Sequence, residues 1–440
     1  MTETARTAGT TRNVDPAAFL PDDLIDRFRA RAADYDRENR FFDEDLAELR
    51  ELGYLQLLVP VELGGLGGSL LEAGRIQRRL AEAAPATALA MNMHLVVTGA
   101  ALHAHRLGAE SGERILREAA DGKLFAFGIS EAGNEAMLFD AATRATPDGD
   151  GYTVTGTKIF TSLAPAWDRL VVHGRITDPT GHDAVRDAEA EAGSRLAADA
   201  ATDPDAAPET DNDPQLVFGL IERTDAVRIS TDWDTHGMRA TQSCTTHLQG
   251  APISADHILT ITPVGPNPDP FVTGIFGCFE LLISSVYIGI AQRALAVGTQ
   301  IALTRRSATR GIVHADDPHI RWRLADAAIG IDGVVLELEK LLADLDALGP
   351  GETGPGAVDH GARWFLQFSG AKSRATETAI AAVDEILRAS GGAHFFRRSE
   401  LERLSRDVRA GMYHPSDDES VHASYATALL GEIGAERDPS

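Results

Sequence analysis

The chain has 440 residues, 43% of them hydrophobic, which is enough for about three domains with sizeable cores. Its 66 acidic residues outnumber the 41 basic ones, and the formal net charge is -25. This balance excludes the basic footprint that nucleic acid or an anionic membrane requires, so we expect neither as a partner. No run of about 18 apolar residues predicts a membrane span.

The amino-terminal part of the chain is predicted to be helical. Residues 1–21 lack the basic, apolar and small-residue succession of a secretory signal, and we interpret them as a disordered leader. Asp22 and Asp23 then open a helix with acids that suit the positive end of its dipole. The helical period continues, so we expect an amino-terminal α-helical domain over residues 22–124.

The middle third changes to a period of two. Residues 151–160, 170–175 and 216–221 alternate like strands and predict a central β-barrel domain over residues 125–262. Residues 178–214 interrupt it with eleven acids, two arginines and no apolar periodicity. Such a segment buries too little surface to offset its ordering entropy, so we expect an acidic, disordered insertion.

The helical period returns over residues 263–440. Three long amphipathic segments, 271–303, 320–348 and 357–390, are followed by a shorter one at 423–433. Long helices with short connections indicate a four-helix bundle. The sequence is arranged in successive blocks of helix, strand and helix. This arrangement predicts an α+β fold rather than alternating βαβ units.

The two cysteines, Cys244 and Cys278, lie in different segments without a metal-ligand spacing. Two separate thiols in a chain of this length favour a reducing compartment, so we expect a cytoplasmic protein without a disulfide or a metal site.

Four stretches carry the most specific pattern in the chain. They are Phe127-Gly128-Ile129-Ser130-Glu131-Ala132-Gly133, Gly156-Thr157-Lys158-Ile159-Phe160-Thr161-Ser162, residues 232–243, and residues 391–409 with their Arg406-Asp407-Val408-Arg409 end. Their order and spacing resemble the acyl-CoA dehydrogenase flavoproteins over most of residues 22–437. The resemblance implies an amino-terminal helical domain, a central β-barrel and a carboxy-terminal four-helix bundle, assembled as a homodimer or homotetramer.

The resemblance also implies FAD as cofactor, bound across a subunit interface. Phe127, Ser130, Phe160 and Ser162 would line the isoalloxazine ring, which needs an apolar wall and hydrogen-bonding groups at its redox-active edge. The turn at Gly391 and Gly392 would approach the cofactor of a neighbouring subunit, and Arg305 or Arg306 would reach its pyrophosphate. Two further residues are expected on the substrate side: Arg239 and Ser243.

The reaction implied is α,β-dehydrogenation of an acyl-CoA or related acyl thioester, with electron-transfer flavoprotein or another acceptor as partner. Such a reaction needs a carboxylate base in a dry pocket. Pro415 occupies the position where many family members carry that glutamate, and a proline cannot serve. Glu280, within an apolar helical stretch, is the candidate base.

A second branch on the same scaffold gives the alternative prediction. The stretch Val286-Tyr287-Ile288-Gly289-Ile290-Ala291 and His414, eight residues after Arg406, resemble flavin-dependent monooxygenases of the dibenzothiophene type. His414 and His94 would then be the catalytic histidines, Ser162 the serine, and FMN the cofactor. If the purified protein contained no flavin, this would instead indicate a binding or assembly role.

Overall fold

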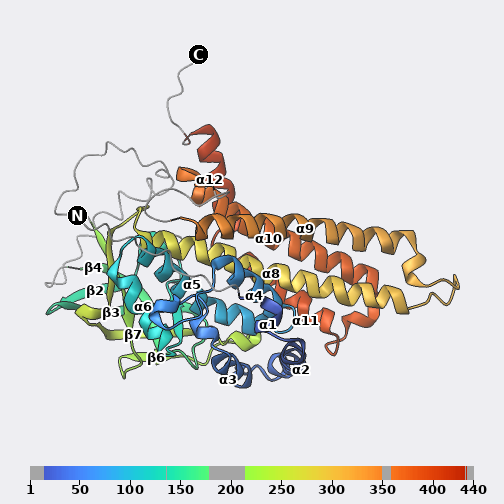
Figure 1. Ribbon diagram of the computed structural model, residues 1–440, viewed down its shortest axis with the longest axis horizontal. Coiled ribbons are helices and arrows are strands. Elements are labelled where there is room, and N and C mark those ends of the chain that lie inside the picture. The colour runs from blue at the N-terminus through green and yellow to red at the C-terminus, as the bar shows by residue number, and fades with distance from the viewer. Residues whose placement is uncertain (1–13, 135, 178–213, 349–357, 432, 434–440) are drawn as a thin grey trace, which may run out of the picture.

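The computed structural model describes residues 14–134, 136–177, 214–348, 358–431 and 433 (Figure 1). Its amino-terminal part is helical up to Ala120. The ordered chain begins earlier than the predicted leader allows, because Leu20 is fully buried and the backbone N–H of Val14 donates to Glu72 Oε1 at 2.7 Å. Residues 1–13 lie outside the described residues. The helices are α1 (Pro16–Phe19), α2 (Asp22–Glu38), α3 (Asp43–Glu51), α4 (Leu70–Ala81), α5 (Pro85–Arg106) and α6 (Glu110–Ala120).

Local sequence explains where two of these helices begin. Ser69 caps α4 by accepting from the backbone N–H of Glu72, whose carboxylate accepts from the N–H of Ser69 in return. This reciprocal pair satisfies two of the N–H groups that a helix start leaves without partners. Pro85 occupies the first turn of α5, where its missing N–H costs nothing.

The central domain is an eight-stranded sheet in the order β6-β7-β3-β2-β4-β5-β8, with β1 pairing β4. The strands β2 and β3 form a hairpin whose turn needs Gly149 at φ 60°, a conformation that side chains disfavour. The predicted acidic insertion connects β4 to β5 and, except for Pro214, lies outside the described residues. The strands are β1 (Phe125–Gly128), β2 (Arg144–Asp148), β3 (Gly151–Thr161), β4 (Arg169–Ile176), β5 (Gln215–Ile221), β6 (Val227–Ile229), β7 (Cys244–Ile253) and β8 (Ile258–Pro263).

The carboxy-terminal part is again helical, and its long helices run side by side away from the sheet (Figure 1). The last helix begins at Asp418, five residues before the predicted start, because the Asp417 carboxylate caps it by accepting from the N–H of Ser420. The helices are α8 (Pro270–Thr304), α9 (Pro318–Asp346), α10 (Trp364–Ser390), α11 (Glu400–Asp407) and α12 (Asp418–Leu430). The α+β class and the three-part architecture are therefore confirmed.

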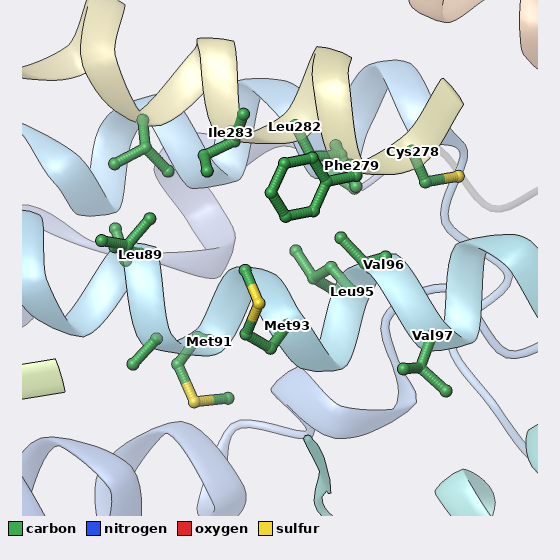
Figure 2. Close-up of a cluster of buried hydrophobic side chains, with 14 of the residues drawn as sticks. Leu89, Met91, Met93, Leu95, Val96, Val97, Cys278, Phe279, Leu282 and Ile283 are labelled. Carbon is green, nitrogen blue, oxygen red and sulfur yellow. The ribbon is translucent and has the colours of Figure 1, made fainter. Parts of the chain in front are cut away.

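Helices α5 and α8 form the centre of the core. Both are long and apolar enough to span a membrane by length and composition, but inside this fold they are almost entirely buried. Figure 2 shows Met93 and Val96 of α5 facing Phe279 of α8. Close packing depends on small residues, since a Cβ at Gly289 of α8 would collide with the backbone of α4 at Arg78.

Arg406 and Asp407 connect the amino-terminal, central and carboxy-terminal parts of the fold through hydrogen bonds. The Arg406 guanidinium binds the Asp36 carboxylate of α2 at 2.6 and 2.9 Å and the His236 carbonyl at 2.9 Å. Asp407 Oδ1 accepts the backbone N–H of Met238 at 2.7 Å. Paired charges of this kind, held by several hydrogen bonds, set the relative position of the parts.

Candidate active site

A cavity of about 1330 Å³ lies where the three parts meet, between α5, the sheet and α8. It exceeds the roughly 300–1,000 Å³ of common small-molecule pockets, so it has room for a cofactor together with a substrate. Seven residues predicted from the sequence line it: Phe127, Ser130, Phe160, Ser162, Ser243, Glu280 and His414.

One wall of the cavity is aromatic. Phe160 has φ 55° at the end of β3, next to an irregularity in its pairing with β7, and 53% of the residue remains exposed. A positive φ is unfavourable for a residue with a side chain, and such strain concentrates at functional sites. The Phe160 ring meets Trp233 edge-on, with centroids 6.1 Å apart. Trp233 lies in one of the motif stretches, but the sequence assigned it no role.

A chain of hydroxyl groups runs along the same wall. Thr241 Oγ1 donates to the carbonyl of Met238 at 2.9 Å, so Ser243 must donate to Thr241, at 2.7 Å. Ser162 in turn donates to Ser243, also at 2.7 Å. With its only proton used in this way, the Ser162 oxygen offers lone pairs to the cavity.

Lys158 and Glu131 form a buried ion pair behind this wall. Lys158 Nζ lies 2.8 Å from Glu131 Oε1 and 3.1 Å from His173 Nδ1. Glu131 also accepts the backbone N–H groups of Ala142 and Thr143. Burial alone would raise the pKa of Glu131, but the charge and hydrogen bond of Lys158, together with the hydrogen bonds of Thr143 and Ala142, outweigh burial and lower that pKa to about 2. These two motif residues therefore hold the strand ends in place rather than face the cavity.

Glu280 is part of the cavity lining contributed by α8 and is fully buried. Its Oε1 accepts the hydroxyl of Ser416 at 2.7 Å, and its Oε2 has no hydrogen-bond partner among the described residues. Burial raises the pKa of Glu280 to about 8, against the opposing effects of Ser416 and Lys372. Lys372 of α10, also buried, was not identified from the sequence, although it is one of only four lysines in the chain.

His414 enters the cavity beside Glu280. Its Nδ1 lies 2.9 Å from the hydroxyl of Tyr287, a fully buried residue of α8. A buried hydroxyl needs an acceptor, and the structure gives Tyr287 no other partner among the described residues, so we assign Tyr287 as donor and place the ring proton on Nε2. Burial, with the nearby Lys372 charge, lowers the pKa of His414 to about 3, which keeps the ring neutral.

His94 is placed differently. It is fully buried in α5, outside the cavity lining. Its Nε2 lies 2.9 Å from the carbonyl of Leu55, and its Nδ1 accepts the backbone N–H of Phe125 at 3.2 Å. Both ring nitrogens are therefore occupied by backbone groups. The structure does not bring His94 and His414 together at one site.

The remaining predicted residues lie outside the cavity. Arg239 binds the carbonyls of Asp36 and Thr235, an arrangement that joins α2 to the segment before β7. Arg305 Nη1 donates to the carbonyl of Ser390 at 2.7 Å, beside the turn at Gly391 and Gly392. Arg306, Gly391 and Gly392 are exposed on this corner of the molecule.

Two family models match the chain and together cover more than half of it. Residues 23–123 match the acyl-CoA dehydrogenase, N-terminal domain, and residues 281–418 match the acyl-CoA dehydrogenase, C-terminal domain. The chain belongs to the acyl-CoA dehydrogenase family.

Relatives within this family have names that point beyond dehydrogenation. The amino sugar nitrososynthase RubN8 of Streptomyces rubradiris is 29% identical, over 95% of this chain and 90% of the relative. Dibenzothiophene monooxygenase of Mycolicibacterium goodii is 27% identical, over 94% and 93%. A solved structure of KijD3 in complex with FMN and an amino-keto sugar nucleotide has a TM-score of 0.77 and 26% identity, and covers 97% of both chains.

The cavity of this family member fits a flavin. The aromatic residues Phe127, Phe160 and Trp233 supply an apolar wall, and the Ser162 hydroxyl ends the chain of hydroxyl groups on the same side. A flat, partly polar ring system needs such a wall together with a few placed hydrogen-bonding groups. The chain is thus a flavin-dependent oxidoreductase of the acyl-CoA dehydrogenase family.

Proposed function

We propose that this protein is a flavin-dependent monooxygenase that uses reduced FMN and dioxygen. The observation that carries the proposal is His414, a neutral imidazole held in the cavity by Tyr287, next to Pro415, where a dehydrogenase of the common type has its base. The relatives support the same reaction class, since their names describe a monooxygenase of dibenzothiophene and a nitrososynthase of amino sugars.

In this reaction bound reduced flavin supplies two electrons, and dioxygen supplies one oxygen atom to the substrate and one to water. The residues of the chain contribute position and protons. His414 Nε2–H donates a hydrogen bond into the cavity, where a developing negative charge on oxygen would be stabilised. Ser162 offers an acceptor oxygen to the cavity. Such an oxygen suits an N–H group of a reduced ring better than the bare nitrogen of an oxidised ring.

Dehydrogenation of an acyl thioester is the second candidate, and Glu280 is the observation that favours it. A carboxyl group with a raised pKa and a free oxygen in the cavity is suited to remove a proton. In that case electron-transfer flavoprotein or another acceptor would take the electrons.

One experiment separates the two reactions. The flavin-loaded protein is mixed without oxygen with a series of acyl-CoA thioesters, and the flavin spectrum is recorded. We expect no bleaching by any of them. After chemical reduction of the flavin, admission of labelled dioxygen with substrate should place one labelled atom in the product. Bleaching by an acyl-CoA would establish the dehydrogenase instead.

The turn at Gly391 and Gly392 leads to a prediction about the phosphate end of the flavin cofactor. A Cβ at Gly392 would meet nothing within 4 Å in the subunit itself, so Gly392→Val should fold normally. If the phosphate end of a neighbouring subunit's flavin approaches this backbone, the variant should lose flavin while its circular dichroism is unchanged. Flavin occupancy, measured by absorbance, checks this, and full occupancy would contradict the placement.

The exposed face of α9 supports assembly into a homodimer or homotetramer. Trp322, Ile329 and Leu336 recur every seven residues and are each more than 70% exposed. If a two-fold axis passes through Ile329, Trp322 of one copy would face Leu336 of the other. An isologous contact requires such a pairing. We expect Ile329→Asp to lower the mass seen by light scattering by at least half. Asp332→Ala, a neighbouring exposed change, should leave the mass unaltered.

A further inference from the structure

Glu280 has one oxygen for which the described residues provide no partner. Its Oε1 accepts the Ser416 hydroxyl at 2.7 Å, and Ser416 has φ 55°, an unfavourable backbone conformation for a residue with a side chain. Its Oε2 is buried and makes no hydrogen bond with the described residues, although Glu280 belongs to the cavity lining. A buried polar atom without a partner is costly, so we expect a molecule bound in the cavity to supply that partner.

The surroundings of Glu280 decide whether this oxygen carries a proton. Lys372 Nζ donates to the carbonyls of Gly411, His414 and Ser416 at 3.0 to 3.1 Å, which uses all three protons of the ammonium group. Burial raises the pKa of Glu280 to about 8, although the Ser416 hydrogen bond and the Lys372 charge oppose it. Near neutral pH the group is therefore a neutral carboxylic acid. Because Oε1 accepts from Ser416, the proton lies on Oε2.

The neighbouring side chains offer no acceptor for this proton. The Nδ1 atom of His414 is occupied by the Tyr287 hydroxyl, and its Nε2 atom carries the ring proton. Phe276 and Phe279, which line the cavity from the same helix as Glu280, are apolar. A ligand group that completes this site must therefore present a lone pair rather than a proton.

We propose that the Oε2–H group of Glu280 donates a hydrogen bond to an uncharged acceptor oxygen of the substrate, and so selects substrates that carry such an oxygen. This rests on the proposed monooxygenase function, because a dehydrogenase would need the same group as an ionised base. A carboxylate or phosphate is a poor occupant, since the cost of burying an anion exceeds that of burying an uncharged oxygen. Glu280 is then a specificity-determining residue that binds and orients the substrate.

Glutamine is the informative replacement for Glu280. Its carbonyl oxygen can accept from Ser416 and its amide N–H can donate to the ligand, but it does not ionise. Leucine has a similar size and can neither donate nor accept. A hydrogen-bond donor should therefore survive in Glu280→Gln and be lost in Glu280→Leu, whereas a carboxylate would be lost in both variants.

The test uses two probes of the same shape with the flavin-loaded protein. Acetylnaphthalene has a carbonyl oxygen, and isopropenylnaphthalene, substituted at the same ring position, has a methylene group in its place. Equilibrium dialysis gives the two affinities, and their ratio is compared among variants. We expect the ketone-to-alkene ratio to be about 10-fold higher in the wild type than in Glu280→Leu, the effect of one buried hydrogen bond. Glu280→Gln should stay within about three-fold of the wild type.

The pH dependence identifies the proton. The pKa of Glu280 is raised to about 8, so the donor is present below this pH and is lost as the pH rises through it. The wild-type ratio should fall accordingly, and that of Glu280→Gln should stay constant. Burial and the Lys372 charge lower the pKa of His414 to about 3, and burial raises the pKa of Tyr287 well above its usual value. Lys372, whose pKa burial lowers, and its neighbour Asp417 are retained in Glu280→Gln, so their titration cannot produce the difference.

Ser284→Ala is the matched control on the same helix. The Ser284 hydroxyl donates to the backbone carbonyl of Glu280, so this variant disturbs α8 locally and leaves the carboxyl group in place. Its ratio should stay within about two-fold of the wild type. If Glu280→Leu does not fold, the pH titration of the wild type against Glu280→Gln decides.

Two results would overturn the donor role. A ratio unchanged by Glu280→Leu would show that flavin or water takes the proton, and a Glu280→Gln ratio as low as that of Glu280→Leu would show that a carboxylate acts. Incorporation of labelled oxygen would leave the monooxygenase function standing in either case. Bleaching of the flavin by an acyl-CoA, abolished in Glu280→Gln, would instead reject the proposed function.

Discussion

Replacing Lys158 with methionine is expected to lower the free energy of unfolding by about 3–5 kcal/mol, the cost of leaving one charge of a buried pair uncompensated. Lys158 is fully buried, and its ammonium group lies 2.8 Å from Glu131 Oε1. Methionine fills much of the volume, so the loss reports the charge rather than a cavity. Urea unfolding followed by circular dichroism measures it.

The change should also release the flavin. Glu131 holds the N–H groups of Ala142 and Thr143, and Lys158 lies on β3 two residues before Phe160 of the cavity wall. Lys123→Met, at a partly exposed lysine, is the control and should change stability by less than about 0.5 kcal/mol. A Lys158→Met protein as stable as the wild type would show that the pair contributes nothing.

The pH dependence follows from the same pair. The pKa of Glu131 is lowered from 4.5 to about 2, so its ionised form stabilises the folded state above about pH 4.5, and this contribution is lost as the pH falls toward 2. Without Lys158 the largest favourable influence on the carboxylate is gone. On acidification, the variant should therefore unfold at a higher pH than the wild type does. An acid titration of the circular dichroism signal would record this.

His414→Ala is expected to reduce the oxygenation rate by a factor on the order of 10²–10⁴, the usual effect of losing a positioned proton donor. The ring contacts Phe279 edge-on and binds the hydroxyl of Tyr287, so its position is set by two residues of α8. Flavin should remain bound, because Phe160, Trp233 and Ser162 of the proposed flavin wall are unchanged in this variant. Product formation with reduced FMN and dioxygen is the measurement.

Two comparison variants make this result specific. Tyr287→Phe keeps the packing but removes the hydroxyl that places the proton on Nε2, so we expect a smaller rate loss of about 10-fold. His94→Ala should reduce stability through the lost backbone contacts of Leu55 and Phe125, while the folded fraction keeps its rate. A His414→Ala enzyme with an undiminished rate would exclude this histidine from the reaction.

The two histidines show where a sequence pattern stops being informative. From the sequence alone, His94 and His414 are equally good candidates for a catalytic histidine, since each lies next to apolar residues. Their roles differ because of partners that are distant in the chain: Leu55 and Phe125 occupy both nitrogens of His94, whereas Tyr287 occupies only one nitrogen of His414. These hydrogen bonds join residues 39, 31 and 127 positions apart, and contacts over such separations leave no mark in local periodicity.

The same limit applies to the charged motif residues. The Arg406 motif was recognisable, but its partner Asp36 lies 370 residues away, and nothing in its surroundings distinguishes Asp36 from the other acids of α2. Lys158 was part of a recognised stretch, and its pairing with Glu131 depends on β1 and β3 ending side by side.

The sequence by itself determined the α+β class, the three-part architecture and the family, because apolar periodicity and motif order are local properties that survive without coordinates. Tertiary structure alone decided which polar side chains face the cavity. Six of the thirteen predicted site residues lie outside it, and Glu280 has its free oxygen only because Ser416 takes one oxygen and three carbonyls take the protons of Lys372. Burial and hydrogen-bond partners, which set both pKa and reactivity, arise when distant segments pack together.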